Sequence, residues 1–178
     1  MPESFDLDKE LQISGIVIAG NIDNKLISDV QRHLKRKEDD IEGRRRQIQL
    51  HWNGDCAEVM HYFNRVIKPR IPTLKPKPCL NRWFIQLLDR PKETAIYRPL
   101  VEKGTYNVLI VIEPGAGFPR FYEYSHVGME NEAMAPVISP YVVDVPQREG
   151  AVVLFDATIG RQDSAVEGIG ASYIILVY

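Results

Sequence analysis

Several common features are missing from this chain of 178 residues. No apolar run approaches the ~20 residues that a bilayer-spanning helix needs, so we expect no membrane contact. The two cysteines, Cys56 and Cys79, lack C-x-x-C spacing, which argues against a disulfide framework and against a thiolate metal site. The polar, acidic first residues do not resemble a secretory signal, which predicts a cytoplasmic or nuclear protein.

A strong excess of one charge is also missing. The formal net charge is −2, and the one tight basic run, Arg44–Arg46, has Asp39 and Asp40 beside it. Binding to nucleic acid depends mainly on cations that neutralise phosphates. Nucleic acid is therefore not expected as a partner.

Familiar catalytic motifs are absent as well. The chain contains no G-x-S-x-G elbow, no P-loop and no dinucleotide fingerprint. Cys56 lies on an apolar helical stripe with Met60, Phe63 and Ile67, which predicts a buried thiol rather than a nucleophile. Common hydrolase and nucleotide-binding functions have no support.

Strand patterns dominate the chain from residue 80 onward. Apolar, β-branched and aromatic residues gather in short segments that are separated by glycine and proline. The predicted strands are 80–89, 105–113, 118–127, 137–145, 150–157 and 171–178. So many short strands in succession indicate a barrel or sandwich.

The first part of the chain mixes strands with helices. Alternating apolar residues predict strands at 11–19 and 48–52, and stripes of helical period predict helices at 24–37 and 54–68. A proline-rich connector follows at 69–78. We therefore expect one domain over 1–178, in which a support region (1–79) braces a β-barrel core (80–178).

Three stretches resemble a known family. They are LQISGIVIAGNIDNKLISDVQRHL, TYNVLIVIEPGAGFPRFYEY and PQREGAVVLFDATIGRQDSAVEGIGASYIILVY. Their order is similar to that in iron/2-oxoglutarate-dependent oxygenases, near the phytanoyl-CoA and prolyl hydroxylase-like families. The resemblance implies a mainly β (α+β) fold, a double-stranded β-helix of the jelly-roll or cupin-like kind with two N-terminal helices.

The family's iron ligands are not found where the resemblance implies them. Its His-x-Asp/Glu pair would fall near Tyr97-Arg98-Pro99, its distal histidine near Gln162, and its co-substrate arginine near Ser172. No His-x-Asp or His-x-Glu occurs anywhere in the chain. We therefore expect a degenerate member without the metal triad, and no ordinary iron/2-oxoglutarate dioxygenase activity or cofactor.

The predicted strand 118–127 supplies one set of candidate ligand-binding residues. Arg120, Tyr122, Tyr124 and His126 share one parity, so one face would carry four large polar side chains. Facing inward, they would form a hydrogen-bonding pocket. Facing outward, they would form a tyrosine-rich contact surface.

Two further places supply candidates. Asp156, Arg161 and Gln162 lie in a predicted polar loop between the last two core strands, and barrel-mouth loops commonly bind ligands. Asp156 and Arg161 could instead form a simple ion pair. Tyr97 completes the candidate ligand-binding set from its place before the central strand.

A non-standard metal site is a separate possibility. His51 and Asp55 span a strand-to-helix junction, and Glu130 follows His126 by four residues. Imidazole and carboxylate groups are ordinary metal ligands. Iron and 2-oxoglutarate would be cofactors only with such a set.

Two hypotheses remain for the function. The first is a pseudoenzyme or subunit that binds a small molecule or a protein, including a homo- or hetero-dimer partner. The alternative is an enzyme with altered chemistry on the same barrel, either a non-standard metal oxygenase or a metal-free isomerase or cyclase.

Overall fold

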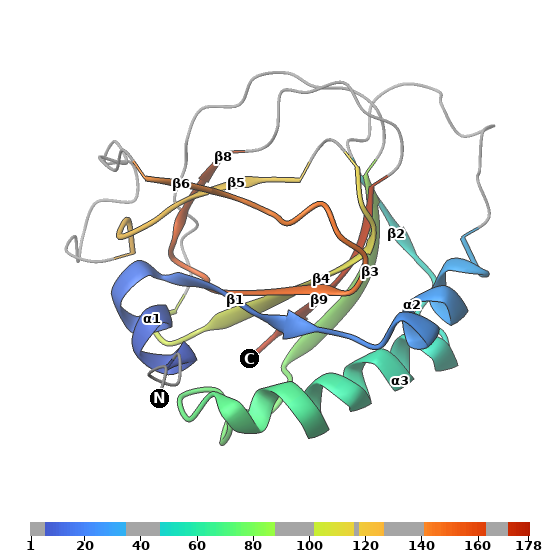
Figure 1. Cartoon of the computed structure of the whole chain (residues 1–178), viewed down its shortest axis with the longest axis horizontal. Coiled ribbons are helices and arrows are strands. Elements are labelled where there is room, and N and C mark those ends of the chain that lie inside the picture. Colours follow the sequence, from blue (N-terminus) through green and yellow to red (C-terminus); the bar gives the residue numbers. More distant parts are fainter. Residues whose placement is uncertain (1–5, 35–46, 88–101, 116–117, 127–140, 163–170) are drawn as a thin grey trace, which may run out of the picture.

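Two antiparallel β-sheets face one another, and helices cover the outer face of the larger sheet (Figure 1). The computed structural model describes residues 6–34, 47–87, 102–115, 118–126, 141–162 and 171–178. This arrangement is that of a double-stranded β-helix, so the predicted mainly β fold class is confirmed. Among the described residues, no helix is long and apolar enough to cross a membrane.

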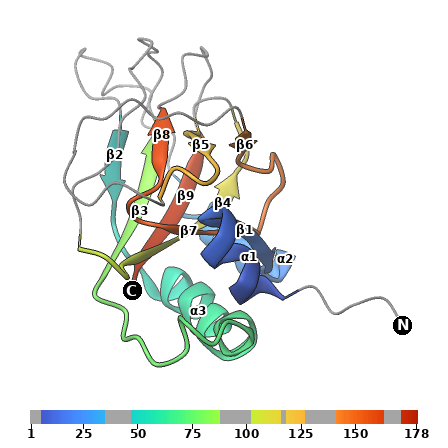
Figure 2. The same cartoon turned by 90° about the vertical axis from the view of Figure 1, so that its left-hand side faces the viewer.

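The larger sheet has six strands and the smaller has three. In spatial order, the large sheet contains β1 (Ile16–Asn21), β7 (Ala151–Asp156), β4 (Tyr106–Glu113), β9 (Ser172–Val177), β3 (Asn81–Leu87) and β2 (Gln47–Leu50). The small sheet contains β6 (Val142–Asp144), β5 (Arg120–Tyr122) and β8 (Gly160–Gln162). Figure 2 shows β6 on the same side of the molecule as β1, and β8 displaced toward β9 and β3.

The helices begin at capped residues. Asp6, Asp23 and Asn53 accept hydrogen bonds from the first backbone N–H groups of α1 (Leu7–Ser14), α2 (Asn24–Gln31) and α3 (Gly54–Tyr62). After α3 the chain continues through a π-helical turn (Phe63–Ile67) and a 3₁₀ turn (Lys68–Arg70). The predicted helix at 54–68 is thus confirmed in position, and the connector after it contains turns as well as extended chain.

The prediction of a strand at 11–19 is wrong for its first half. Leu7 and Leu11 lie one helical turn apart in α1 and are buried, whereas Ile13 is 47% exposed. Gly15 ends the helix with φ of 81°, and the strand begins only at Ile16. The alternation across 11–18 therefore spans a helix end and a strand start.

The large sheet separates two apolar cores because successive strand residues point to opposite faces. One core joins α1, α2 and α3 to outward residues such as Val108, Leu154 and Ile174. The other lies between the two sheets and contains Phe121 and Phe155. All central strands must be apolar on both faces, which explains the continuous run in β4.

Gly15 is a position where the fold requires glycine. Its φ is positive, and a Cβ there would overlap Nδ1 of His126. Replacing Gly15 with alanine should lower the free energy of unfolding by about 2 kcal/mol or more, since the left-handed conformation alone costs an L-residue roughly 1–2 kcal/mol. Urea unfolding measures the change.

Gly54 provides the matched control for Gly15. It lies at the start of α3 with open space around its Cα, so Gly54→Ala should leave the stability unchanged or slightly raised. Equal losses for the two variants would contradict the packing described for Gly15.

Tyr178 anchors the helical layer to the sheet. Its hydroxyl donates to Oδ1 of Asn64 at 2.8 Å, and its ring lies 5.9 Å from that of Phe63, with Nζ of Lys68 4.5 Å above it. Burial raises the pKa of the Tyr178 phenol, and nearby Cys79 adds to the rise. The folded state therefore favours the neutral phenol.

This raised pKa has a consequence for stability at high pH. The unfolded phenol ionises near pH 10, so its contribution to stability is fully present below about pH 10 and is lost as the pH rises toward the folded pKa. Unfolding measured from pH 9 to pH 12 should show a smaller loss of stability for Tyr178→Phe than for the natural protein. An equal or steeper loss would show that this phenol does not contribute.

Candidate functional site

The space between the sheets is filled on the side of β7 and β4. The inward residues there, Leu109, Val111, Val153 and Phe155, are fully buried. The small sheet seals them, and the rings of Phe121 and Phe155 lie 4.6 Å apart. This half of the interior is a packed core.

The inward face on the side of β9 and β3 is accessible. Ile175 is aligned with Leu109 on one side and with Trp83 on the other, so all three side chains point inward. Trp83, Tyr173, Ile175 and Val177 are only half-buried. We call these four residues, together with Asn107 of β4, the open inner face.

The open inner face includes two polar groups without partners. Asn107 is aligned with Phe155 and Val177, so its amide also points inward, and it is half-buried. Within the described part of the chain, neither this amide nor the Trp83 indole N–H makes a hydrogen bond. Because neither group is held by another part of the described protein, both can bind water or a ligand.

A cation faces the same space from β8. Arg161 is aligned with the buried Phe121 of β5, so both side chains lie on the inner face of the small sheet. Phe121 packs on Phe155, and β8 lies one strand further toward β9 (Figure 2). Arg161 therefore faces the large sheet from β8, on the side of Phe155 where β4 and β9 lie. It is half-buried and already has an interaction within the protein.

Gln162, by contrast, faces outward. The Tyr122 hydroxyl donates to its side-chain oxygen at 3.0 Å on the outer face of the small sheet. On the same face Nε of Arg120 donates to Oδ1 of Asp144 at 3.1 Å. Among the predicted ligand-binding residues, Arg120, Tyr122 and Gln162 thus share a surface, and Arg161 lies on its opposite side.

The predicted four-residue face of 120–126 is not formed. The strand ends at Tyr122, and the chain turns through Tyr124, whose φ is +59°. The backbone N–H of Tyr124 donates to the Ser14 carbonyl, and its exposed ring lies edge-on to that of Tyr141 at 5.8 Å. Residues after Tyr122 therefore no longer alternate between the two faces of the strand, and Tyr124 lies on the outer surface of the barrel.

His126 packs against the end of α1. Its Nε2 lies 3.1 Å from the Gln12 carbonyl oxygen, and Nδ1 is buried without a hydrogen bond among the described residues. Its ring covers Gly15. This place lies outside the space between the sheets.

The other metal candidates do not come together. Asp55 binds His33, with Nε2 and Oδ2 2.6 Å apart, rather than His51, which is exposed. Tyr97 and Glu130 lie outside the described residues. Asp156 accepts hydrogen bonds from the backbone and hydroxyl of Thr158.

The described residues do not fit the family's iron site. All four histidines are described, and His33, His51, His61 and His126 all lie outside the inner faces of the sheets. No group of three His, Cys, Asp or Glu in the described residues could hold a metal ion. The residue of β8 that points into the interior is Arg161. Its guanidinium cannot be a metal ligand, because it has no lone pair to donate.

The place expected for a co-substrate arginine also differs. Ser172 is buried, and its hydroxyl lies 3.4 Å from Oε2 of Glu113. A serine beside a carboxylate cannot neutralise the far carboxylate of 2-oxoglutarate. The keto acid therefore has no recognisable anchor at this position.

Comparison with solved structures gives the fold class. The chain is similar to AviO1 from Streptomyces viridochromogenes Tue57, with 18% identity over 97% of this chain and 92% of that one, and a TM-score of 0.66. It is also similar to SnoN, a non-heme α-ketoglutarate-dependent epimerase from nogalamycin biosynthesis (13% identity, 96% and 80% coverage, TM-score 0.66).

A third similar structure is SnoK, a non-heme α-ketoglutarate-dependent carbocyclase (17% identity, 99% and 84% coverage, TM-score 0.64). SnoN has also been solved with Fe³⁺ and α-ketoglutarate. These similarities establish the oxygenase-like fold. No protein-family model and no curated protein matches the sequence.

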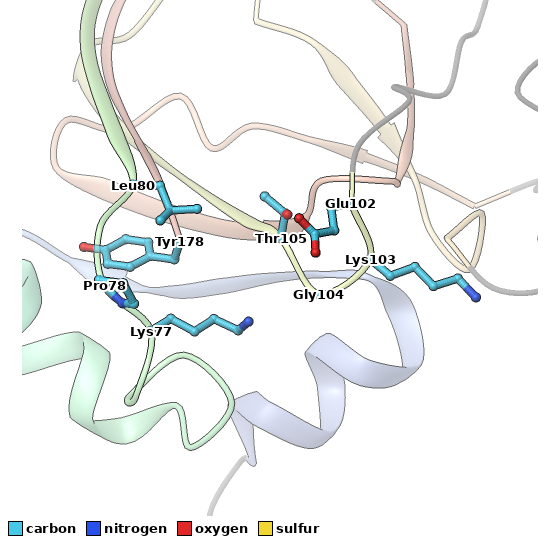
Figure 3. A pocket seen from close by; sticks show the side chains of 8 residues that line it. All are labelled: Lys77, Pro78, Leu80, Glu102, Lys103, Gly104, Thr105 and Tyr178. Atoms are coloured by element: carbon cyan, nitrogen blue, oxygen red, sulfur yellow. The ribbon is translucent and has the colours of Figure 1, made fainter.

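A cleft lies at the end of the large sheet where β3 and β4 begin and β9 ends. Its volume is about 170 Å³, and its lining includes Lys77, Leu80, Glu102, Thr105 and Tyr178. In Figure 3 the Lys103 side chain extends away from this cleft. The Lys77 ammonium is 5.6 Å from the centre of the Tyr106 ring, so it already has an aromatic contact.

Arg161 was among the residues expected from the sequence to bind a ligand, whereas Trp83, Asn107 and Tyr173 of the open inner face were not. The signal was present: in β9, Ser172, Ile174 and Leu176 alternate with Tyr173, Ile175 and Val177. Alternation in one strand shows that it has two faces, but it does not show which face is covered by helices. That becomes clear only when the residues on the neighbouring strands are known.

The Asn107 amide is not needed for the stability of the fold. Replacing it with leucine should leave the free energy of unfolding unchanged or raise it by up to about 1 kcal/mol, because no hydrogen bond within the described protein is lost and apolar area on the inner face is gained. Asn64→Leu is the matched control, and it should be destabilising because it breaks the Tyr178 bond. A loss of stability in Asn107→Leu would contradict the assignment.

Proposed function

We propose that the protein is an enzyme with altered chemistry, which acts on a small molecule at the open inner face. The guanidinium of Arg161 supplies the positive charge of this site, in place of iron held by histidine and carboxylate. One observation carries the proposal: Arg161 points inward from β8 while all four histidines lie outside the barrel interior.

The structural neighbours favour an enzyme over a pseudoenzyme. Two of them are described as an epimerase and a carbocyclase. The fold is therefore compatible with rearrangement of a bound molecule. Function cannot be transferred at these identities, so the chemistry is argued from the residues of this chain.

The residues support chemistry without net oxidation. A guanidinium stays charged at all physiological pH values and can stabilise negative charge that develops on a substrate oxygen. Tyr173 lies on the same inner face, with its ring 5.8 Å from that of Phe118 and a further interaction within the protein, and its phenol can donate a proton. Isomerisation beside a carbonyl group is the reaction class that we infer for this pair. Arg161 would stabilise the negative charge on the oxygen, water would accept the α-proton, and the Tyr173 phenol would return a proton.

Iron and 2-oxoglutarate are not needed by this proposal. A protein partner, including a second copy of the chain, remains a separate proposal. The exposed pair Tyr124 and Tyr141 is the surface on which it rests. Its test is the molar mass in solution from light scattering, where a monomer at all concentrations would exclude self-association.

The proposed function predicts the response to metal. Purified protein supplied with iron(II), ascorbate and 2-oxoglutarate should form succinate no faster than a protein-free sample, because the described interior offers no histidine ligand. Succinate analysis and anaerobic iron titration measure this. Binding of one equivalent of iron together with succinate formation would overturn the proposal.

Proton transfer provides the positive test. In D₂O with a metal chelator, the protein should speed deuterium incorporation beside the carbonyl of an aryl 2-oxo acid such as phenylpyruvate, as followed by NMR. Arg161→Gln should reduce the gain roughly tenfold or more, as expected for loss of a group that stabilises an oxyanion. Arg120→Gln, an outward arginine one strand away, should not. Equal effects of the two variants would contradict the role of Arg161.

A further inference from the structure

We propose that the ligand of the open inner face is a monocarboxylate with an apolar, ring-sized body. Its carboxylate binds Arg161 and the Asn107 amide, and its body lies against Trp83 and Ile175. This inference rests on the proposed function for the location of the site, and it adds the chemical class of the ligand.

A positive charge lies beside the apolar core between the sheets, because Arg161 is half-buried on the inner face of β8. Arg161 has an interaction within the protein, which a ligand would share. A half-buried guanidinium beside an apolar core favours an anion, and its planar shape matches a carboxylate.

The second argument is the unpaired amide across the interior. Asn107 lies on the inner face of β4, between Phe155 and Val177. A side-chain amide offers two N–H donors. A carboxylate between the two sheets could accept from both residues, and it would satisfy the amide that the protein leaves unpaired.

The third argument is the apolar surface beside these polar groups. Trp83, Ile175 and Val177 are half-buried although they face inward, and the indole N–H has no partner within the described chain. If the ring of the ligand lay against the indole and Ile175, its apolar surface would be removed from water. Ligand pockets are commonly apolar in this way, with a few fixed polar groups. A cationic ligand would be repelled by Arg161.

Intrinsic fluorescence can report this binding. The chain has two tryptophans. Trp52 lies outside the barrel, and the centre of its ring is 5.1 Å from Cζ of the Arg82 guanidinium. In a Trp52→Phe background, Trp83 is the sole tryptophan reporter. The probes are 3-phenylpropionate and its neutral amide, titrated with a chelator present.

The carboxylate should change Trp83 fluorescence saturably and bind roughly tenfold or more tightly than the amide, since hydrogen bonds to a charged group are stronger than neutral ones. Arg161→Gln should remove this preference, and Asn107→Ala should weaken carboxylate binding severalfold. Arg120→Gln should change neither. Circular dichroism checks that each variant is folded; if Arg161→Gln is not, Arg161→Lys should still show a reduced preference.

Each outcome has a defined meaning. Absence of saturable carboxylate binding, or equal affinity for acid and amide, would overturn the inference. Carboxylate binding that Arg161→Gln and Arg161→Lys leave unchanged would also overturn it. Binding without any turnover would support the ligand class while removing support for an enzyme, whereas turnover of a neutral substrate alone would do the reverse.

Discussion

The contact between Phe121 and Phe155 fixes what the barrel interior contains. The two rings are 4.6 Å apart and join the small sheet to the large one. Residues that lie opposite one another on paired strands point to the same face. Because Phe121 points inward, Arg161, which lies opposite it on β8, also points inward. Arg161 is thereby directed inward and Gln162 outward. A cation therefore lies on the inner side of β8.

One part of the barrel interior is a packed core, and another part is accessible to solvent. Around β7 and β4 it is closed by fully buried aliphatic and aromatic side chains, which hold the two sheets together. Around β9 and β3, Trp83, Tyr173, Ile175 and Val177 are half-buried, although Ile85 on the same face is buried. The indole of Trp83 and the amide of Asn107 on β4 have no hydrogen-bond partner within the described chain, so a ligand could bind them without breaking a hydrogen bond of the protein. This contrast within one sheet locates the site.

Most of the fold could be predicted from the sequence because its core strands are long and apolar. The strands β3, β4, β7 and β9 fall within their predicted ranges. Short elements could not be predicted. The strand β8 is Gly-Arg-Gln, which has no alternation of apolar and polar residues. The helix α1 was missed because the spacing of Leu11, Ile13, Ile16 and Ile18 resembles that of a single strand. At the site, the role of Arg161 stays a prediction. The positive φ of Tyr124 ends the alternation that would have placed Tyr124 and His126 on one face with Arg120 and Tyr122.

The central claim is that a guanidinium, and not a histidine-bound metal, supplies the positive charge between the sheets. A crystal structure with 4-iodobenzoate, recorded with the iodine anomalous signal, tests this most directly. The account predicts an iodine peak between the sheets beside Trp83, with the carboxylate at Arg161. A protein-bound metal ion in that space, or an iodine peak only outside the barrel, would contradict it.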